Sequence, residues 1–325
     1  MKIGILGCGG IARTLAGTFN AMEEVSCYAV ASRSLEKAQT FASENGFEKA
    51  YGSYEELVAD PEVGLVYIAT PHSRHFEDMK LCIEAGKPVL CEKSFTINSA
   101  EAREISELSK SKGVYAAEAI WTRYMPSRGM IDEMIESGII GTPKMLTANL
   151  SYVIAQNARI VDPALAGGAL LDVGVYGVNF AIMHFGRDIE KIESSVQMTD
   201  TGVDGQESIT IHYTDGRMAV LTHGIYSRSD RKGIIYGDKG YIVVENINNP
   251  SSITAYDMDD NELKRITVPE QISGYEYEVM EAIDMIEKHH TESASMPLSE
   301  SIYIMELMDG IRQDWGLVYP KESES

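Results

Sequence analysis

The first 118 residues alternate short apolar runs with amphipathic stretches. The apolar runs have the length of buried strands and span residues 3–6, 25–31, 65–69, 89–91 and 114–117. Helix-compatible stretches lie between them, at residues 11–21, 34–43, 54–59, 75–85 and 99–110. Two of these begin with capping-box residues, Ser53-x-x-Glu56 and Asn98-x-x-Glu101. Strands that alternate with helices predict a doubly wound α/β domain, whose parallel sheet is covered on both faces.

After residue 140 the pattern changes to strands with alternating apolar and polar positions. They span residues 144–153, 207–213, 217–225, 233–236, 241–245, 252–257 and 263–268. Asp215-Gly216 and Asp238-Lys239-Gly240 are typical of hairpin turns, and helical patterns follow at residues 275–288 and 299–315. This half predicts an α+β domain with an open, mainly antiparallel sheet. We therefore expect one domain at residues 1–120 and a second at residues 121–325.

The residues after the first apolar run have the spacing of a dinucleotide-binding turn. Gly7 allows a tight turn, Gly9 lets the backbone approach a pyrophosphate, and Ala12 lets the helix pack closely on the strand. The amide groups at the helix start, at Gly10 and Ile11, then face the phosphate charge. Strand, turn and helix in this order predict a dinucleotide-binding Rossmann domain, although an ordinary strand–helix turn has similar residues.

The end of the second strand indicates which dinucleotide is bound. NAD-binding proteins place a carboxylate there, but this chain has Ser32-Arg33-Ser34. An Arg pairs with a 2′-phosphate, and hydroxyls bond the same group. We expect NADP to be preferred over NAD. Alternatively, Arg33 is a solvated surface charge and both cofactors are accepted.

Composition narrows the class of protein. The 325 residues carry 28 Lys and Arg against 49 Asp and Glu, a formal net charge of −21. So acidic a chain is not expected to bind nucleic acid or anionic membranes, and no apolar run approaches the length of a membrane span. The four cysteines lack paired spacing and predict free thiols without a disulfide or metal framework. Free thiols indicate a reducing compartment. Because a strand begins directly at the N-terminus, we also expect no signal peptide, and therefore a cytoplasmic location.

Polar residues follow two of the expected parallel strands at their carboxyl ends, where doubly wound folds bind ligands. Thr70-Pro71 and then His75 follow the strand at residues 65–69, and Glu92-Lys93 follows the strand at residues 89–91. We expect all five to lie at the cofactor. The alternatives are a structural role for His75 and a plain surface ion pair for Glu92 and Lys93.

A glycine-rich segment in the second half combines an acid with a phenol. If the chain is helical from residue 171, Asp172 and Tyr176 lie four residues apart on one face. Gly174 and Gly177 weaken a helix by about 1 kcal/mol each relative to Ala, which indicates close approach to a ligand or to another backbone. The alternative is a buried, tightly packed helix.

Together these stretches resemble the glucose–fructose oxidoreductase / inositol dehydrogenase / MocA (Gfo/Idh/MocA) family of NAD(P)-dependent oxidoreductases, over nearly the whole chain. The matching motifs are Gly7-x-Gly9-x-x-Ala12, Thr70-Pro71 with His75, Glu92-Lys93, and Gly168-x-Leu170-x-Asp172-x-Gly174-x-Tyr176. Residues 118–124 with Pro126 are similar to the branch of dimeric dihydrodiol dehydrogenases and NADP-linked D-xylose dehydrogenases. The chain departs from the family pattern at Ser94, usually Pro, at Tyr176, usually His, and at Asn179, usually Asp.

The resemblance implies hydride transfer between the nicotinamide and a carbon that bears a hydroxyl, in a cleft between the domains. Tyr176 is then the acid/base, with Lys93 beside it and Asp172 orienting Lys93 or a substrate hydroxyl. The competing assignment makes Lys93 the proton carrier and Tyr176 a positioning group. Trp121 and Arg123 are expected to line the substrate side, or else to pack between domains.

We therefore expect an NADP-dependent dehydrogenase of a sugar or vicinal diol that needs no metal. The alternatives are an NAD-dependent inositol or amino-sugar dehydrogenase and a non-catalytic NADP sensor. An open sheet leaves one face uncovered, so a homodimer through the sheet of the second domain is also expected.

Overall fold

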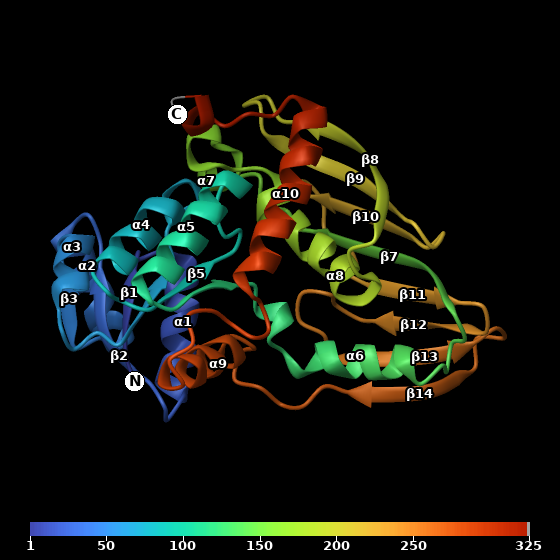
Figure 1. Cartoon of the computed structure of the whole chain (residues 1–325), viewed down its shortest axis with the longest axis horizontal. Helices are drawn as coiled ribbons and strands as arrows, with labels where there is room; N and C mark the ends of the chain where they lie inside the picture. Colours follow the sequence, from blue (N-terminus) through green and yellow to red (C-terminus); the bar gives the residue numbers. More distant parts are fainter. Residues whose placement is uncertain (324–325) are drawn as a thin grey trace. The chain divides into compact units, whose positions relative to one another are not determined.

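The computed structural model describes residues 1–323 and divides into two compact units (Figure 1). The first unit contains Met1–Tyr124 and Gln271–Glu306, and the second contains Met125–Glu270 and the segment that starts at Leu307.

The first unit is built on a parallel sheet with the strand order β3-β2-β1-β4-β5-β6. Its strands are β1 (Lys2–Leu6), β2 (Ser26–Ala31), β3 (Lys49–Tyr51), β4 (Leu65–Ile68), β5 (Val89–Glu92) and β6 (Ala116–Ala119). Its helices are α1 (Gly10–Ala21), α2 (Leu35–Asn45), α3 (Tyr54–Ala59), α4 (His72–Glu84), α5 (Ser99–Lys112), the 3-10 turn η1 (Trp121–Arg123) and α9 (Glu276–Glu287). This confirms the doubly wound α/β prediction.

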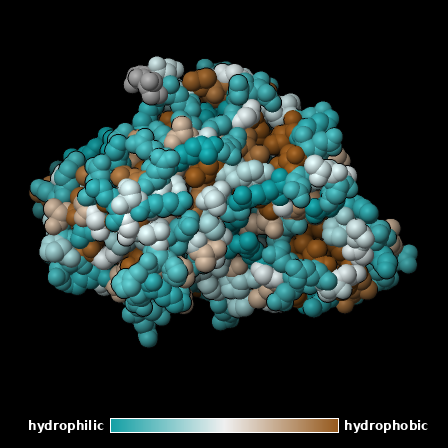
Figure 2. Space-filling view, viewed as in Figure 1, coloured by the Kyte–Doolittle hydropathy of each residue, from teal (hydrophilic) through white to brown (hydrophobic). Residues whose placement is uncertain are grey.

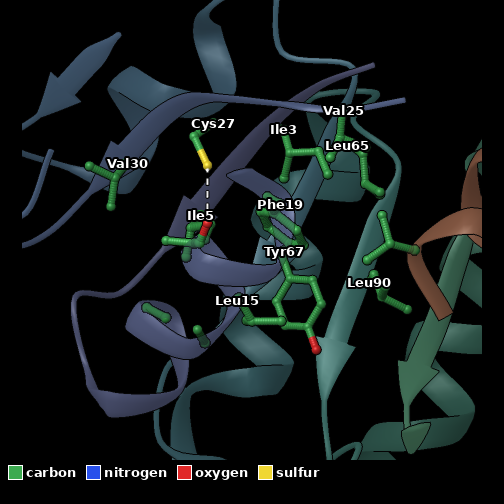
Figure 3. Packing of buried hydrophobic residues seen from close by; sticks show 14 of the residues in the cluster. Ile3, Ile5, Leu15, Phe19, Val25, Cys27, Val30, Leu65, Tyr67 and Leu90 are labelled. Atoms are coloured by element: carbon green, nitrogen blue, oxygen red, sulfur yellow. Dashed lines mark hydrogen bonds between the residues drawn. The ribbon is translucent and has the colours of Figure 1, made fainter. Parts of the chain in front are cut away.

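The core of the first unit joins α1 and α9 to the strands. Figure 3 shows Leu15 and Phe19 of α1 packed beside Tyr67 of β4, with the Phe19 and Tyr67 ring centroids 6.1 Å apart. Val279 and Ala282 of α9 are fully buried in the same cluster. A helix near the C-terminus therefore completes the N-terminal core. We expected the second domain to run without a break from residue 121 to 325. In the structure α9 belongs to the first unit instead, because its apolar face is buried against the first sheet.

The second unit is built on an eight-stranded sheet with the order β14-β13-β12-β11-β7-β10-β9-β8. Its strands are β7 (Pro143–Ser151), β8 (Ile189–Met198), β9 (Asp204–Tyr213), β10 (Met218–Gly224), β11 (Gly233–Gly237), β12 (Gly240–Val244), β13 (Ser252–Asp257) and β14 (Glu262–Thr267). Within this sheet, for the residues that the structure describes, only β7 and β10 pair in parallel. The predicted open, mainly antiparallel sheet is confirmed.

Helices cover one face of this sheet. They include α6 (Pro126–Glu136) and α8 (Val175–Phe185), which lie along the sheet in Figure 1. Short helical segments precede α8: α7 (Ala158–Val161), η2 (Pro163–Leu165) and the π-helix η3 (Leu170–Gly174). The long helix α10 (Leu298–Trp315) contains the boundary between the units, and α11 (Pro320–Ser323) follows it.

One segment of the described chain, Pro163–Phe185, is long and apolar enough to cross a membrane, with a mean hydropathy of 1.5. It is not a run of consecutive apolar residues, because Asp172 and Asn179 interrupt it. The segment is 94% buried inside the structure, however, and the core helix of a globular protein passes the same test. On the face drawn in Figure 2, hydrophilic residues predominate.

Candidate functional site

The turn between β1 and α1 leaves open space at the helix start. Gly7 has φ +109, and a side chain there would strike the Ala69 carbonyl at 2.8 Å. At Gly9 and Gly10, by contrast, no described heavy atom lies within 4 Å of where a Cβ would stand. Among the described residues α1 has no side-chain cap, and its first turn has no acidic residue. Its amide groups therefore fit an anionic pyrophosphate.

A pocket of about 340 Å³ adjoins this turn. Its lining includes Cys8, Arg13, Ser34 and Lys37, together with Glu36, Thr40, Phe41 and Glu44. Arg33 is exposed, whereas Ser32 is buried and its Oγ accepts a bond from the Ser34 amide at 3.5 Å. Sequence reasoning missed Lys37 as a binding candidate; its signal is its position in the first turn of α2, beside the Ser34 cap.

His75 joins the loops that follow β4 and β5. It is fully buried, with Nδ1 2.8 Å from the Ser94 carbonyl oxygen and Nε2 2.9 Å from that of Thr70. Thr70 in turn donates to the buried Asp78 at 2.8 Å, and Pro71 occupies the N-cap position of α4 without a side-chain cap bond. These contacts support the structural alternative for His75, which positions the two loops rather than offering a free ring to a ligand.

Glu92 lies inside the first unit. It is 7% exposed and accepts a bond from the Tyr67 hydroxyl at 2.9 Å, and the same hydroxyl lies 2.7 Å from Glu278 of α9. Burial, and then the charge of Glu92, raise the pKa of Glu278 well above its usual value. The burial of Glu92 therefore argues against a surface position for this residue.

Lys93 is half-buried beside a carboxylate that sequence reasoning missed. Glu118 of β6 is 1% exposed and accepts a bond from the Phe95 amide at 3.0 Å. Burial raises the pKa of Glu118, while the bond from the Phe95 amide and the charges of Arg123 and Lys93 act in the opposite direction. The Ser94 loop is held although it lacks the usual proline, because Ser94 is fully buried and its carbonyl contacts His75.

Trp121 and Arg123 make contacts within the first unit. The Trp121 ring stacks on Tyr275 with centroids 4.2 Å apart, and it is 8% exposed. Arg123 is 4% exposed and forms an ion pair with Glu300 at 3.2 Å. These contacts favour packing over the expected substrate-lining role.

In the second unit the helical geometry differs from the expectation at Asp172 and Tyr176. Asp172 lies in the π-helix η3, whereas Tyr176 lies in the first turn of α8, so the four-residue spacing of a regular α-helix does not relate them. Both are 7% exposed. Asp172 accepts a bond from Arg159 Nη2 at 3.0 Å, and sequence reasoning missed Arg159.

The glycines of this helix pack against buried side chains of the second sheet. A side chain at Gly174 would overlap Glu207, and one at Gly177 would overlap His223. Asn179 is fully buried and donates to the Val175 carbonyl at 2.8 Å. Within residues 1–323 no group of three His, Cys, Asp or Glu could hold a metal ion.

Comparison with known proteins gives consistent matches. Residues 1–119 match the oxidoreductase family with an NAD-binding Rossmann fold, and residues 130–243 match the GFO/IDH/MocA C-terminal domain. Trans-1,2-dihydrobenzene-1,2-diol dehydrogenase from Mus musculus is 33% identical, and that from Homo sapiens is 32% identical, each over 99% of both chains.

Solved structures have the same fold. A 3-ketoreductase from Actinomadura kijaniata, in complex with NADP and TDP-benzene, has a TM-score of 0.88 at 22% identity and covers 96% of this chain and 97% of its own. An aldose-aldose oxidoreductase from Caulobacter crescentus has a TM-score of 0.87 at 19% identity, over 98% and 99% of the two chains. From the two family matches and the full-length relatives, the chain belongs to the Gfo/Idh/MocA family and is an NAD(P)-dependent oxidoreductase that acts on CH–OH groups.

Proposed function

We propose that the protein oxidises a vicinal diol or sugar hydroxyl with NADP, or reduces the corresponding carbonyl. The observation that carries this proposal is the full-length similarity to trans-1,2-dihydrobenzene-1,2-diol dehydrogenases. The sterically open, uncapped start of α1 supports dinucleotide binding. When bound, the nicotinamide supplies or accepts the hydride.

Tyr176 is the proposed acid/base. Tyr176 exchanges a proton with the substrate hydroxyl. Asp172, which accepts a bond from Arg159, orients Lys93 or a substrate hydroxyl. An isolated phenol has a pKa near 10, so ionisation at pH 7 costs about 4 kcal/mol. A close ammonium such as that of Lys93 offsets a cost of this size in a water-poor site. If both residues act on one substrate, the effects of Lys93→Met and Tyr176→Phe on kcat are not additive.

The preference for NADP is proposed to come from cations near the end of β2. Arg33 lies on the exposed loop, and Arg13 and Lys37 line the adjoining pocket. Charge-assisted bonds to a phosphate are stronger than neutral ones. Glu36 and Glu44 line the same pocket and repel a phosphate. NADP is therefore preferred only if the attraction of the cations exceeds the repulsion by these two carboxylates.

The test is an absorbance assay at 340 nm with NADP and NAD against trans-dihydrodiols, D-xylose, D-glucose and inositols. Reduction of NADP by a dihydrodiol or aldose is the expected result. Activity with NAD and an inositol or amino sugar alone would overturn the substrate and cofactor assignments. NADP binding without turnover of any substrate would favour the sensor.

A homodimer through the second sheet is also proposed. Tyr236, Tyr241 and Tyr256 are partly exposed cross-strand neighbours on the face opposite the buried core positions. The rings of Tyr241 and Tyr256 stack at 5.1 Å. Such an aromatic strip supports burial against a second copy. Light scattering of wild type and Tyr241→Glu tests this: we expect a dimer that the substitution weakens, and a monomeric wild type would contradict it.

The proposed location is the reducing cytoplasm, without stable attachment to membranes or nucleic acid. All four cysteines, which lie within the described range, are free. Burial raises the pKa of the Cys27 thiol to about 11, so this group is protonated at neutral pH. Fractionation of cells that make the protein tests the proposal, and recovery with the membrane fraction would contradict it.

A further inference from the structure

Three ionisable side chains lie buried between the second sheet and the segment that carries Asp172 and Tyr176. Asp204 and Glu207 belong to β9 and His223 to β10, and each is at most 4% exposed. Glu207 and His223 are paired across the two strands, and Nδ1 of the imidazole lies 2.9 Å from Glu207 Oε1. We call Asp204, Glu207 and His223 the buried cluster.

The buried cluster contacts the glycine-rich segment at three separate points. A side chain at Gly168 would overlap the Asp204 carboxyl, one at Gly174 would overlap Glu207, and one at Gly177 would overlap His223. Each glycine therefore provides space for one member of the cluster. For Gly174 and Gly177 the sequence alone left open a ligand or another backbone, and the structure shows side chains of the protein itself.

Asp204 also bonds the backbone at the start of the π-helix. Its Oδ2 accepts the amide of Leu170, the first residue of η3, at 2.5 Å. Amide groups at a helix start lack partners within the helix, and a buried amide without any partner costs about 1–3 kcal/mol. π-Helical turns are rare in proteins and mostly occur as single turns.

Burial favours the uncharged form of each member of the buried cluster. Burial raises the pKa of Asp204 well above its usual value and that of Glu207 to about 8, and burial lowers the pKa of His223 to about 3. Both carboxyls then hold protons, and the imidazole is neutral. A protonated carboxyl donates as well as accepts, so a protonated Glu207 donates to Nδ1 of the neutral His223 at 2.9 Å.

We propose that Asp204, Glu207 and His223 form a neutral hydrogen-bonded support that fixes the π-helical turn and thereby the positions of Asp172 and Tyr176. They are positioning residues, because Asp204 accepts a bond from the helix backbone and Glu207 and His223 bond each other. The proposal deepens the proposed function, since it rests on Tyr176 as the acid/base.

The experiment compares Glu207→Leu, which removes the bonds, with Glu207→Gln, which keeps a neutral side chain of similar shape that still donates and accepts. For Glu207→Leu we expect kcat to fall about 30-fold, KM to change less than threefold and NADP binding to stay unchanged. Glu207→Gln should recover at least tenfold of that loss. These factors correspond to the loss of one or two buried hydrogen bonds at about 1.4 kcal/mol per factor of ten.

Hydrogen exchange of the amides in residues 170–177 provides a readout that does not need turnover. Glu207→Leu should accelerate it at least tenfold, while the amides of β1 exchange at the wild-type rate. The matched control is Glu193→Leu, which breaks the exposed Glu193–His212 pair at 2.8 Å on β8 and β9. The control should leave both kcat and exchange unchanged.

Two outcomes overturn the proposal. Unchanged exchange and kcat in Glu207→Leu would remove the support role, and a loss in Glu207→Gln as large as that in Glu207→Leu would mean that the carboxyl itself is required. If the wild type turns over no substrate, the proposed function fails, and hydrogen exchange alone still decides whether the buried cluster supports the helix.

Discussion

Both units of this protein contain a glycine-rich segment at the start of a helix, and the glycines serve opposite purposes. At Gly9 and Gly10 no described atom lies within 4 Å of the position that a Cβ would occupy, so the space is free for a ligand. At Gly174 and Gly177 the equivalent space is filled by Glu207 and His223. The same residue type thus leaves room for a cofactor in one unit and for the protein's own buried side chains in the other.

The largest effect on catalysis is expected at the helix of the second unit, where protein side chains occupy the space beside Gly174 and Gly177. Tyr176→Phe should lower kcat about 100-fold or more, because general acid/base catalysis contributes about 10²–10⁴. Steady-state kinetics with saturating NADP measures it. A loss confined to KM would instead make Tyr176 a binding group and would favour Lys93 as the proton carrier.

Two equal substitutions, Gly177→Ala and Gly10→Ala, test whether the space beside the glycines is occupied in the second unit and open in the first. The first forces a methyl group into His223, and overpacking of this kind costs about 1–3 kcal/mol, so the thermal midpoint should fall by several degrees. The second should leave the midpoint within about one degree and raise the Kd for NADP roughly tenfold, since it blocks close approach of a phosphate. Equal loss of stability in both variants would refute the distinction.

A smaller effect is expected at the pocket beside the open glycines. Lys37→Ala should weaken NADP about tenfold and leave NAD within twofold, because a charge-assisted bond contributes about 1.5–3 kcal/mol. Isothermal titration with each cofactor measures this. Lys110→Ala, in the last turn of α5, is the matched control, and parallel losses for NADP and NAD would show that Lys37 does not contact the 2′-phosphate.

The smallest effect is a change in how stability depends on pH. Glu207 has a folded pKa of about 8, above its unfolded value near 4.5, so its contribution is complete below pH 4.5 and is lost as pH rises through 8. His223 has a folded pKa of about 3, so its contribution is present above pH 6.5 and is lost as pH falls.

Glu207→Gln should therefore flatten the decline in unfolding free energy between pH 6.5 and 8. The neighbouring ionisable groups are the Asp204 carboxyl, whose pKa burial raises well above its usual value, and the Tyr319 hydroxyl, whose pKa burial raises well above 10. Urea unfolding at several pH values measures the slope. An unchanged slope would mean that Glu207 is already ionised in the folded protein.

Local features of the fold were predictable from sequence. The capping residues Ser53 and Asn98 accept the expected bonds from the amides of Glu56 and Glu101, at 3.2 and 2.9 Å. The strand β8 was missed because none of its residues is fully buried, so it lacks the apolar alternation of a core strand. The helix α6 was also missed, although Pro126 occupies its first turn.

Nonlocal features could not be predicted in the same way. The sequence identified Glu92, but it gave no means to place Glu278, which lies 186 positions later and shares the Tyr67 hydroxyl with it. A charged residue such as Arg123 is expected on the surface or at a ligand. Its ion pair with Glu300 forms because the chain returns to the first unit after residue 270.

The sequence alone determined the two sheet types, the dinucleotide turn at Gly7–Ala12 and the motifs that identify the family. These depend on backbone conformation and on neighbours within a few residues, which periodicity and residue type report directly. Only the tertiary structure decided that α9 completes the first core, that His75 positions two loops, and that Gly174 and Gly177 accommodate Glu207 and His223. The physical reason is that a glycine in the sequence shows only that a side chain is missing. The group that occupies the space comes from a strand far away in the sequence, which local patterns do not report.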